Sequence, residues 1–547
     1  MVKFSVSNRD AFLKKLKNEK FDLLIIGGGI TGAGIALDAA SRGLKTALVE
    51  KNDFAFGTSS RSTKLIHGGL RYLKQLEFGL VKEVGSERAI VHRLAPHLVL
   101  PEKMLLPLSE KRGLGYWLTS IGLRIYDYLA GVKAEDRRMM LTRSQTFKYE
   151  PLLKADDING GAIYAEYRTD DARLTIEIIK TAFRQGATIL NYLPVSDFIY
   201  VDGKVKGIVA ADVLNGKRIE IAAEVVVSAA GPWVDEVREI NNSKKGKRLH
   251  LTKGVHIVVP REKLPVKQSI YFDVDDGRMI FAIPRGRTTY VGTTDTNYSG
   301  SIDNVGATTD DARYLINAVN ATFPDVSLKL EDIESWWAGL RPLIHEEGKS
   351  ASQLSRKDEI FESDSGLISI AGGKLTGYRK MAERVVNLVL KNHFSQRKAL
   401  KCFTDKITLS GSDFHTNKDV RKYINEVHQR LTIHGFDELM AAYLVTTYGK
   451  QTETIIQLFE NMIDSSEPSL KLMKSEFLFC VNQEMVVSLS DFFVRRTGLM
   501  YFNISKVIEN YQPMAEYVKG LLGWDANRCQ QELNDIRAMI DKIKTFS

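Results

Sequence analysis

The chain of 547 residues is poor in cysteine and contains no long hydrophobic run. Its three cysteines, Cys402, Cys480 and Cys529, all lie in the last third and show neither a C-x-x-C pair nor another metal-ligand spacing. This pattern argues against a disulfide framework and a bound zinc, so no metal site is predicted. No stretch approaches the ~18 consecutive apolar residues of a membrane-spanning helix. Residues 1–20 also lack the apolar segment of a signal peptide, so we expect a soluble or peripheral protein in a reducing compartment.

Acidic residues are outnumbered by basic ones, which gives a formal net charge of +9. The basic residues are spread along the chain and no nucleic-acid-binding module is recognisable, which argues against nucleic acid as a partner. An anionic substrate combined with an anionic membrane surface explains the excess as well. The length is too great for one hydrophobic core, so two or three domains are expected.

Residues 21–50 read as a strand, a glycine-rich turn, a helix and a second strand that ends in an acid. The turn matches G-x-G-x-x-G, with Gly27 for the tight turn, Gly29 for close approach of a pyrophosphate, and Gly32 for helix–strand packing. The helix N-terminus offers N–H groups and a partial positive charge to phosphates. Glu50 follows at the distance at which a carboxylate accepts the ribose hydroxyls. The stretch therefore predicts an adenine-dinucleotide site.

Small hydroxyl residues alternate with cations in the next stretch, residues 53–75. Hydroxyl and backbone groups of this kind suit contacts to the phosphates and ring edge of a cofactor. A double glycine beside a cation and a phenol, His67-Gly68-Gly69-Leu70-Arg71-Tyr72, lets a backbone approach a planar ring. A polar loop with Arg71 as a solvated charge is the alternative. The predicted cofactor contacts here are Thr58, Ser59, Ser60, Lys64, His67 and Gly68.

Residues 96–150 have a different character, because apolar and aromatic residues are surrounded by basic ones. Residues 113–133 carry their apolar side chains at helical spacing. This fits an interfacial helix that dips into an anionic leaflet. A helix buried inside the fold gives the same pattern, and the pattern alone favours it.

Later segments predict three kinds of architecture. Strand and helix signals return over 161–231 and 366–389, short alternating runs over 250–340 indicate an antiparallel sheet, and 398–547 has helical periodicity. We therefore predict an α/β plus α+β protein in which an antiparallel-sheet substrate domain is inserted into a Rossmann-like dinucleotide domain, followed by a helical domain. The predicted limits are 20–95, 151–249 and 341–395 for the dinucleotide domain, 96–150 for an insert, 250–340 for the substrate domain and 398–547 for the helical domain.

Two of these segments carry further candidate cofactor contacts. An apolar strand ends in small residues at Gly231, although it could equally be one more core strand. Another strand is followed by a glycine pair and a helix that starts near Tyr378, and the backbone at Gly373, Leu375 and Thr376 would approach the cofactor there. A helix N-terminus aimed at a flavin would stabilise negative charge on its reduced ring.

Several stretches together resemble the FAD-dependent glycerol-3-phosphate dehydrogenases, within the wider glycine/D-amino-acid oxidase group. The motifs that carry the resemblance are GGGITGAGIALDAASRGL, GTSSRSTKLIHGGLRYL, APHL, IGLRIYDYL, YRTDDARL, AAGPWVD, TKGVHIVVPR, VGTTDT, GLRPL and IAGGKLTGYRKMAE. They cover most of residues 20–390, and the helical C-terminal domain is also similar to that family's. The resemblance implies that the dinucleotide is FAD.

The resemblance also implies a reaction, hydride transfer from C2 of sn-glycerol 3-phosphate to flavin N5, which leaves dihydroxyacetone phosphate. At matching positions it assigns the substrate to Arg71, Tyr72 and Lys374, and the chemistry to His256 and Arg341. His256 would accept the hydroxyl proton, because a guanidinium stays protonated in proteins. Arg341 would polarise the developing ketone. From the residues alone a single histidine on a strand is more often structural, and the resemblance reverses that preference.

The electron acceptor implied by the resemblance is a membrane quinone. Relatives that use oxygen often carry an additional insert, and no such segment is evident here, so quinone is favoured over an oxidase reaction. The expected location is cytoplasmic, peripheral on the inner face of the cytoplasmic membrane. A homodimer is left open.

Two rival functions remain at this stage. An amino-acid or amine oxidase of the same fold would need an arginine for a carboxylate and an apolar pocket, whereas Arg71, Lys374 and Arg341 favour a doubly charged phosphate. A non-catalytic flavin-binding module would hold FAD that no small alcohol or amine reduces.

Overall fold

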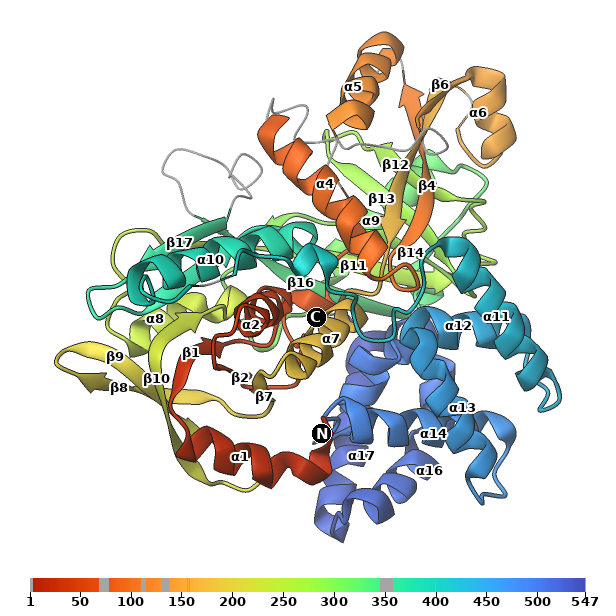
Figure 1. Ribbon diagram of the computed structural model, residues 1–547. Helices are drawn as coiled ribbons and strands as arrows, with labels where there is room; N and C mark the ends of the chain where they lie inside the picture. Colours follow the sequence, from red (N-terminus) through yellow and green to blue (C-terminus); the bar gives the residue numbers. More distant parts are fainter. Residues whose placement is uncertain are drawn as a thin grey trace.

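The computed structural model describes residues 3–67, 78–109, 115–129, 137–154, 156, 158–344, 358–398 and 400–546. These residues form two large sheets with flanking helices and a helical C-terminal body that packs against both (Figure 1). The predicted fold class is confirmed.

The first sheet is the dinucleotide-type sheet. Its strands are β17 (Asp358–Glu362), β18 (Ile368–Gly372), β10 (Arg218–Ser228), β1 (Phe21–Ile26), β2 (Thr46–Val49) and β7 (Thr188–Leu190), in that spatial order, with the hairpin β8 (Val195–Val201) and β9 (Lys204–Ala211) added at β10. The pairs from β18 to β7 are parallel. The central strands are apolar on both faces because helices cover them, as the run in β1 predicts.

Helices pack on this sheet and on one another. They are α1 (Arg9–Asn18), α2 (Ile30–Ser41), α4 (Phe78–Leu94), α7 (Asp171–Arg184), α8 (Val234–Ile240) and α10 (Tyr378–His393). The small-residue face of α2 lies between α7 and α10. Its alanines allow this close approach, and together with the strands they form one continuous hydrophobic core.

The second sheet has ten strands. They are β3 (Leu65–Ile66), β4 (Leu100–Ser109), β5 (Met139–Thr142), β6 (Ile158–Arg168), β11 (Leu249–Pro260), β12 (Ser269–Asp273), β13 (Met279–Arg285), β14 (Thr288–Gly292), β15 (Thr296–Asn297) and β16 (Ser335–Ile344). All of its pairs are antiparallel except β12 with β4. Helices α6 (Arg143–Tyr149) and α9 (Thr309–Thr322) accompany this sheet.

Strand pairing in the two sheets crosses the predicted domain limits at several places, and the limits themselves stay a prediction. Strands β4 and β5 of the predicted insert 96–150 belong to the second sheet, and β6 joins them although it lies in the range 151–249 assigned to the dinucleotide domain. Strand β16 runs across the predicted limit at residue 340. Strand pairing joins segments that are distant in sequence, and a local sequence pattern does not show which strands will pair.

The amphipathic helix of the 96–150 segment is α5 (Gly115–Leu129), which lies beside α4 at one end of the molecule (Figure 1). Leu123 and Tyr126 are buried against the body, whereas Ile121 and Tyr128 are 55% and 86% exposed. The helix therefore has one face inside the fold and apolar residues on its outer face. No helix among the described residues is both long enough and apolar enough to cross a bilayer.

The C-terminal body consists of helices α11 (Asn417–Thr432), α12 (Glu438–Tyr448), α13 (Thr452–Asn461), α14 (Pro468–Gln483), α15 (Leu499–Phe502), α16 (Ile504–Leu522) and α17 (Ala526–Lys544). Its hydrophobic core extends into the second sheet, where Trp337 and Tyr290 pack against Phe502. The body is therefore part of the wall behind the substrate sheet.

Buried ion pairs connect the same body to the dinucleotide domain. Asp53 accepts hydrogen bonds from Arg495 Nε at 2.6 Å and from Arg496 Nη1 at 2.7 Å. Glu484 accepts from both terminal nitrogens of Arg173, at 2.7 and 2.9 Å. Each of these side chains is at most 5% exposed, so each buried charge depends on its partner.

Candidate active site

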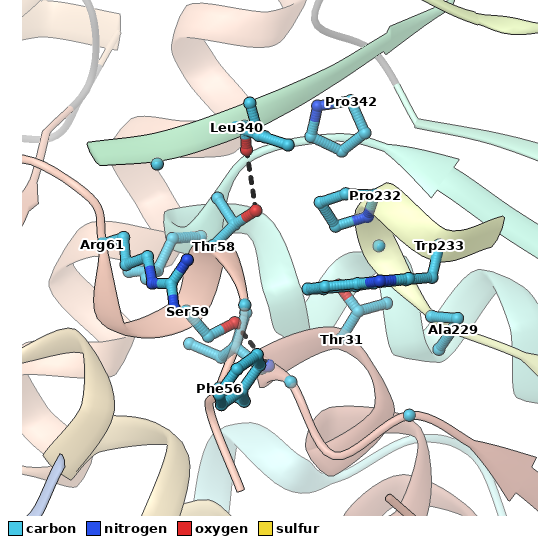
Figure 2. A pocket seen from close by; sticks show the side chains of 18 of the residues that line it. Thr31, Phe56, Thr58, Ser59, Arg61, Ala229, Pro232, Trp233, Leu340 and Pro342 are labelled. Carbon is cyan, nitrogen blue, oxygen red and sulfur yellow. Dashed lines mark hydrogen bonds between the residues drawn. The ribbon is translucent and has the colours of Figure 1, made fainter. Parts of the chain in front are cut away.

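A cavity of about 480 Å³ lies between the two sheets. From the first sheet it is lined at the carboxyl ends of β1, β2, β10 and β18, the edge at which open α/β sheets bind ligands. From the second sheet it is lined by residues of β11 and β16. Figure 2 shows Thr58, Ser59 and Arg61 on one side of the cavity and Pro232 and Trp233 opposite them. Its volume is in the range of small-molecule and cofactor sites.

The glycine-rich turn lies at the start of α2, with Gly27 and Gly29 in the cavity wall. Gly32 lies behind the wall, where a Cβ would be 1.9 Å from the carbonyl oxygen of Gly27. Only glycine permits this contact between the helix and the turn. The turn consequently lies close against the helix N-terminus, whose partial positive charge faces the cavity.

Glu50 directly follows β2 and also lines the cavity. Its Oε2 accepts a hydrogen bond from the Gly28 backbone N–H at 2.6 Å, and its Oε1 accepts from Asn52 N–H at 2.8 Å. Burial raises the pKa of this carboxyl, while the two N–H donors oppose the rise. The carboxyl is fixed at the cavity edge, and its remaining lone pairs can accept ribose hydroxyls.

The hydroxyl-rich turn is divided between cavity and interior. Thr58 and Ser59 line the cavity, and Ser59 Oγ accepts a hydrogen bond from Ile30 N–H at 3.0 Å, at the first residue of α2. Ser60 and Lys64 do not line it. Both are buried.

The Lys64 side chain is turned to the interior, and its contact with a cofactor stays a prediction. Its Nζ donates to Asp171 Oδ1 at 2.5 Å and to the carbonyl oxygen of Ser60 at 3.2 Å. The Lys64 ammonium group, predicted to contact a cofactor, is neutralised by the buried Asp171 carboxylate.

Two other strand ends contribute backbone to the cavity. Gly231 begins a short 3-10 turn after β10, and Gly373, Leu375 and Thr376 follow β18 at the start of α10. The parallel register of β1, β10 and β18 brings these segments together with the α2 turn. All four of these predicted contacts line the cavity.

His256 lies on β11 at the second-sheet side of the cavity and is 2% exposed. Its ring stacks on Trp337, with centroids 4.7 Å apart and planes 10° apart, and Nε2 is 3.0 Å from Thr63 Oγ1. Nδ1 is buried, and no residue in the described part of the chain forms a hydrogen bond with it. Burial, with the charges of Arg341 and Lys64, lowers the pKa of His256 well below its ordinary value. The imidazole is therefore neutral at physiological pH.

Arg341 points to the same face of the β11–β16 ladder as His256, with the facing pair Gly254 and Gly339 between them. The missing Cβ atom of Gly254 allows the Arg341 guanidinium and Thr293 Oγ1 to lie over it. The missing Cβ atom of Gly339 likewise allows Arg61 to lie over it. Arg341 Nη1 donates to Asp295 Oδ1 at 3.1 Å, which orients the guanidinium. The strands thus place a neutral base and a cation at one end of the cavity.

The remaining predicted substrate and cofactor residues divide into two groups. Lys374 and His67 line the cavity. Gly68, Arg71 and Tyr72 lie outside the described residues.

Sequence reasoning missed four residues of the site. Trp233 forms the wall opposite the hydroxyl turn, Thr63 contacts His256, and Trp337 supports the His256 ring. Arg61 lines the cavity although it was noted only as one cation in a polar run. No local pattern separates Arg61 from Lys64, whose charge is paired internally.

The residues present fit an adenine dinucleotide. Backbone at the start of α2, a fixed carboxylate at the end of β2 and an aromatic wall at Trp233 all face one cavity. These are the donor and acceptor types needed for pyrophosphate and ribose. In the part of the chain that the structure describes, no cluster of three His, Cys, Asp or Glu side chains is arranged to hold a metal ion.

Two protein-family models match the chain. Residues 22–379 match the FAD dependent oxidoreductase family, and residues 402–529 match the C-terminal domain of alpha-glycerophosphate oxidase. The chain is 47% identical over 543 residues to the aerobic glycerol-3-phosphate dehydrogenase of Bacillus subtilis, with 97% of each chain covered. It is also 47% identical to the enzyme of the same name from Staphylococcus saprophyticus, over 100% of this chain and 98% of that one.

Solved structures give a consistent picture. A glycerol-3-phosphate dehydrogenase from Bacillus halodurans, complexed with FAD, superimposes with a TM-score of 0.85 at 42% identity and covers 99% of both chains. An L-alpha-glycerophosphate oxidase from Mycoplasma pneumoniae with bound FAD superimposes with a TM-score of 0.55 at 18% identity, over 70% of this chain and 96% of that one. The second likeness concerns the fold alone.

Proposed function

Because the chain belongs to the family of FAD-dependent oxidoreductases, we propose that it oxidises sn-glycerol 3-phosphate to dihydroxyacetone phosphate. Full-length relatives named aerobic glycerol-3-phosphate dehydrogenase support this substrate. FAD, when bound, supplies the two-electron acceptor for the C2 carbinol. The observation that carries the proposal is the pairing of neutral His256 with Arg341 on one face at the end of the cavity.

His256 takes the proton of the C2 hydroxyl in this proposal. A general base must be unprotonated at the working pH, and burial beside a cation keeps this imidazole so. Stacking on Trp337 and the contact with Thr63 fix the ring plane. The C2 hydrogen leaves with both bonding electrons as a hydride, which the bound two-electron acceptor would take, while the hydroxyl proton passes to His256 and the C2–O bond becomes a carbonyl.

Cations on the two sides of the cavity suit the remaining parts of the substrate. Arg341 is oriented by Asp295 and by the Thr294 carbonyl, so it can polarise the oxygen that becomes the ketone. Lys374 lines the cavity on the opposite, first-sheet side and suits a phosphate dianion. Arg71 and Tyr72 stay predictions for the phosphate.

The deciding experiment is anaerobic absorbance of the purified holoprotein before and after addition of sn-glycerol 3-phosphate. Bleaching of the flavin bands is the expected result, with D-amino acids and sarcosine as negative controls. A flavin spectrum that stays oxidised with sn-glycerol 3-phosphate, but bleaches with an amino acid or amine, would discard the substrate. A flavin that no alcohol or amine reduces would favour a binding module.

The proposed electron acceptor is a membrane quinone, with oxygen as the alternative. The outer face of α5 supports peripheral contact with an anionic leaflet on the inner side of the cytoplasmic membrane, because exposed apolar side chains such as Ile121 and Tyr128 lie beside the exposed Arg124. Readmission of air or of a soluble quinone to the bleached protein distinguishes the two acceptors by their reoxidation rates. A homodimer stays a prediction.

Membrane contact through α5 is tested by changing Ile121 and Ile125 to serine together. We expect weaker co-sedimentation with phosphatidylglycerol vesicles and slower reduction of membrane quinone, with unchanged bleaching by substrate. Ile433→Ser, at a residue of the helical body that is 82% exposed, is the matched control. Equal vesicle binding by all three proteins would show that α5 does not mediate the membrane contact. If the wild-type protein does not bind vesicles, the proposal of peripheral membrane binding is wrong.

A further inference from the structure

Arg61 lines the cavity, and its positive charge forms no ion pair with a carboxylate among the described residues. Lys51 has Asp303 at 2.7 Å and Arg341 has Asp295 at 3.1 Å. In the described part of the chain, no acceptor lies within hydrogen-bonding distance of the Arg61 guanidinium, and no carboxylate pairs with it. The Phe56 ring lies beside it, with the ring centroid 5.2 Å from Cζ.

Without a bound anion, the positive charges around Arg61 lower the stability of the folded protein. Its guanidinium is close enough to the Arg495 guanidinium and to the Lys542 ammonium group for their positive charges to repel it. Burial lowers the pKa of Arg61, while the nearby Tyr501 opposes this shift and Arg495 adds to it. A desolvated cation among other cations is destabilising unless a counter-charge is supplied. Arg61 lines the cavity, so an anion bound there can supply this charge.

The place of Arg61 in the chain indicates which anion this is. The residue ends the short turn Thr58–Ser60, and that turn is held to the first residue of α2 by the Ser59–Ile30 hydrogen bond. Figure 2 shows its side chain on the same side of the cavity as Thr58 and Ser59. The start of α2 is where a dinucleotide's pyrophosphate is expected.

We propose that Arg61 binds the diphosphate of FAD as its side-chain counter-ion, while the α2 N-terminus supplies backbone donors. A guanidinium can donate two parallel hydrogen bonds to phosphate oxygens. The same contact neutralises the cation that faces Arg495 and Lys542. FAD binding thereby relieves repulsion at the contact between the dinucleotide domain and the helical body. The proposal depends on FAD and not on the choice of substrate.

The test is equilibrium binding of three ligands to apoprotein: FAD, ADP and riboflavin. Arg61→Gln should lower the affinities for FAD and ADP by about 10- to 100-fold, because charge-assisted hydrogen bonds to the diphosphate are lost. The affinity for riboflavin, which has no phosphate, should not change. Arg61→Lys should recover part of the loss. Lys51→Gln removes a cavity cation that already has a carboxylate partner, so we expect a change below about threefold.

Thermal unfolding of the same proteins separates a binding role from a structural one. Arg61→Gln apoprotein should melt at or above the wild-type temperature, because an unpaired cation is removed, while the upward shift caused by FAD should shrink. Equal FAD affinity in wild type and variant would overturn the proposal. A parallel loss of riboflavin affinity would also overturn it, and so would a lower melting temperature of the variant apoprotein. No substrate is present, so the result is independent of whether sn-glycerol 3-phosphate bleaches the flavin.

Discussion

At the scale of the residue, His256 owes its predicted chemistry to neighbours from other segments. Trp337 stacks on the ring and Thr63 contacts Nε2, while Gly292 lies so close that a Cβ there would be 2.1 Å from Cδ2. Burial beside Arg341 keeps the ring neutral. The same imidazole on an exposed strand would be partly protonated at neutral pH.

Replacement of His256 by alanine should slow substrate-driven flavin reduction by about 10²-fold or more, since the proton acceptor is lost. Rapid-mixing absorbance under anaerobic conditions measures the rate. The control is His250→Ala, because this residue lies on the same strand as His256, is half-buried and does not line the cavity. It is hydrogen-bonded to Asn297, and flavin reduction in this variant should keep the wild-type rate. Wild-type reduction by the His256 variant would remove this residue from the mechanism.

The pH dependence of flavin reduction follows from the lowered pKa of His256. Because the folded protein holds this histidine neutral below its ordinary pKa of 6.5, the acid limb of the rate profile should lie below pH 6.5. Arg341→Gln removes one of the charges that lower the pKa and should move that limb toward higher pH, in addition to lowering the rate. An acid limb that does not move would show that the limb belongs to another group.

At the scale of the element, α2 depends on one close contact with its own turn. A Cβ at Gly32 would overlap the carbonyl oxygen of Gly27, so Gly32→Ala must move either the helix or the turn. We expect about 1–3 kcal/mol loss of unfolding free energy and weaker FAD binding. Denaturant titration and flavin fluorescence measure the two effects. Gly520→Ala, in α16 with open space at its Cβ, should instead be neutral or slightly stabilising.

Helix α14 contains a buried acid that makes stability depend on pH. Burial raises the pKa of Glu476 to about 7, and Tyr443 donates a hydrogen bond to it at 2.8 Å. Between the unfolded pKa of 4.5 and about 7 the folded protein binds the extra proton, so this group costs stability progressively as pH rises. The full cost, up to roughly 3 kcal/mol, applies above about pH 7.

Glu476→Gln should therefore raise the melting temperature at pH 8.5 and change it little at pH 4.5. The amide oxygen keeps the hydrogen bond from Tyr443 and carries no charge. Scanning calorimetry at the two pH values is the measurement. Stabilisation of equal size at both values would mean that ionisation of Glu476 is not its cause.

At the scale of the whole molecule, the helical body and the dinucleotide domain are held together by the buried ion pairs around Asp53. We expect Asp53→Asn to lower the unfolding free energy by about 3–5 kcal/mol, because Arg495 and Arg496 lose their shared carboxylate. The calorimetric transition should also separate into two. Glu224→Gln disturbs only partly exposed pairs and should change stability by less than about 1 kcal/mol. One unsplit transition in the Asp53 variant would contradict this coupling.

The sequence by itself determined the local elements of this protein. Strand, glycine turn, helix and acid in residues 21–50 follow from short-range sterics and periodicity, and the structure has β1, α2 and β2 there. Alternating runs likewise predicted β12, β13 and β14, and helical periodicity predicted α12, α13 and α17. The α/β plus α+β class followed from the order of these signals.

Tertiary structure decided which of those elements meet. Strand pairing drew β4 and β5 into the second sheet with β6, and the β11–β16 register put His256 and Arg341 on one face. Charge pairing likewise assigned Lys64 to the interior and left Arg61 in the cavity. Sheet register and ion pairing join residues far apart in the chain, so their outcome depends on the free energy of the whole fold and cannot be read from local pattern.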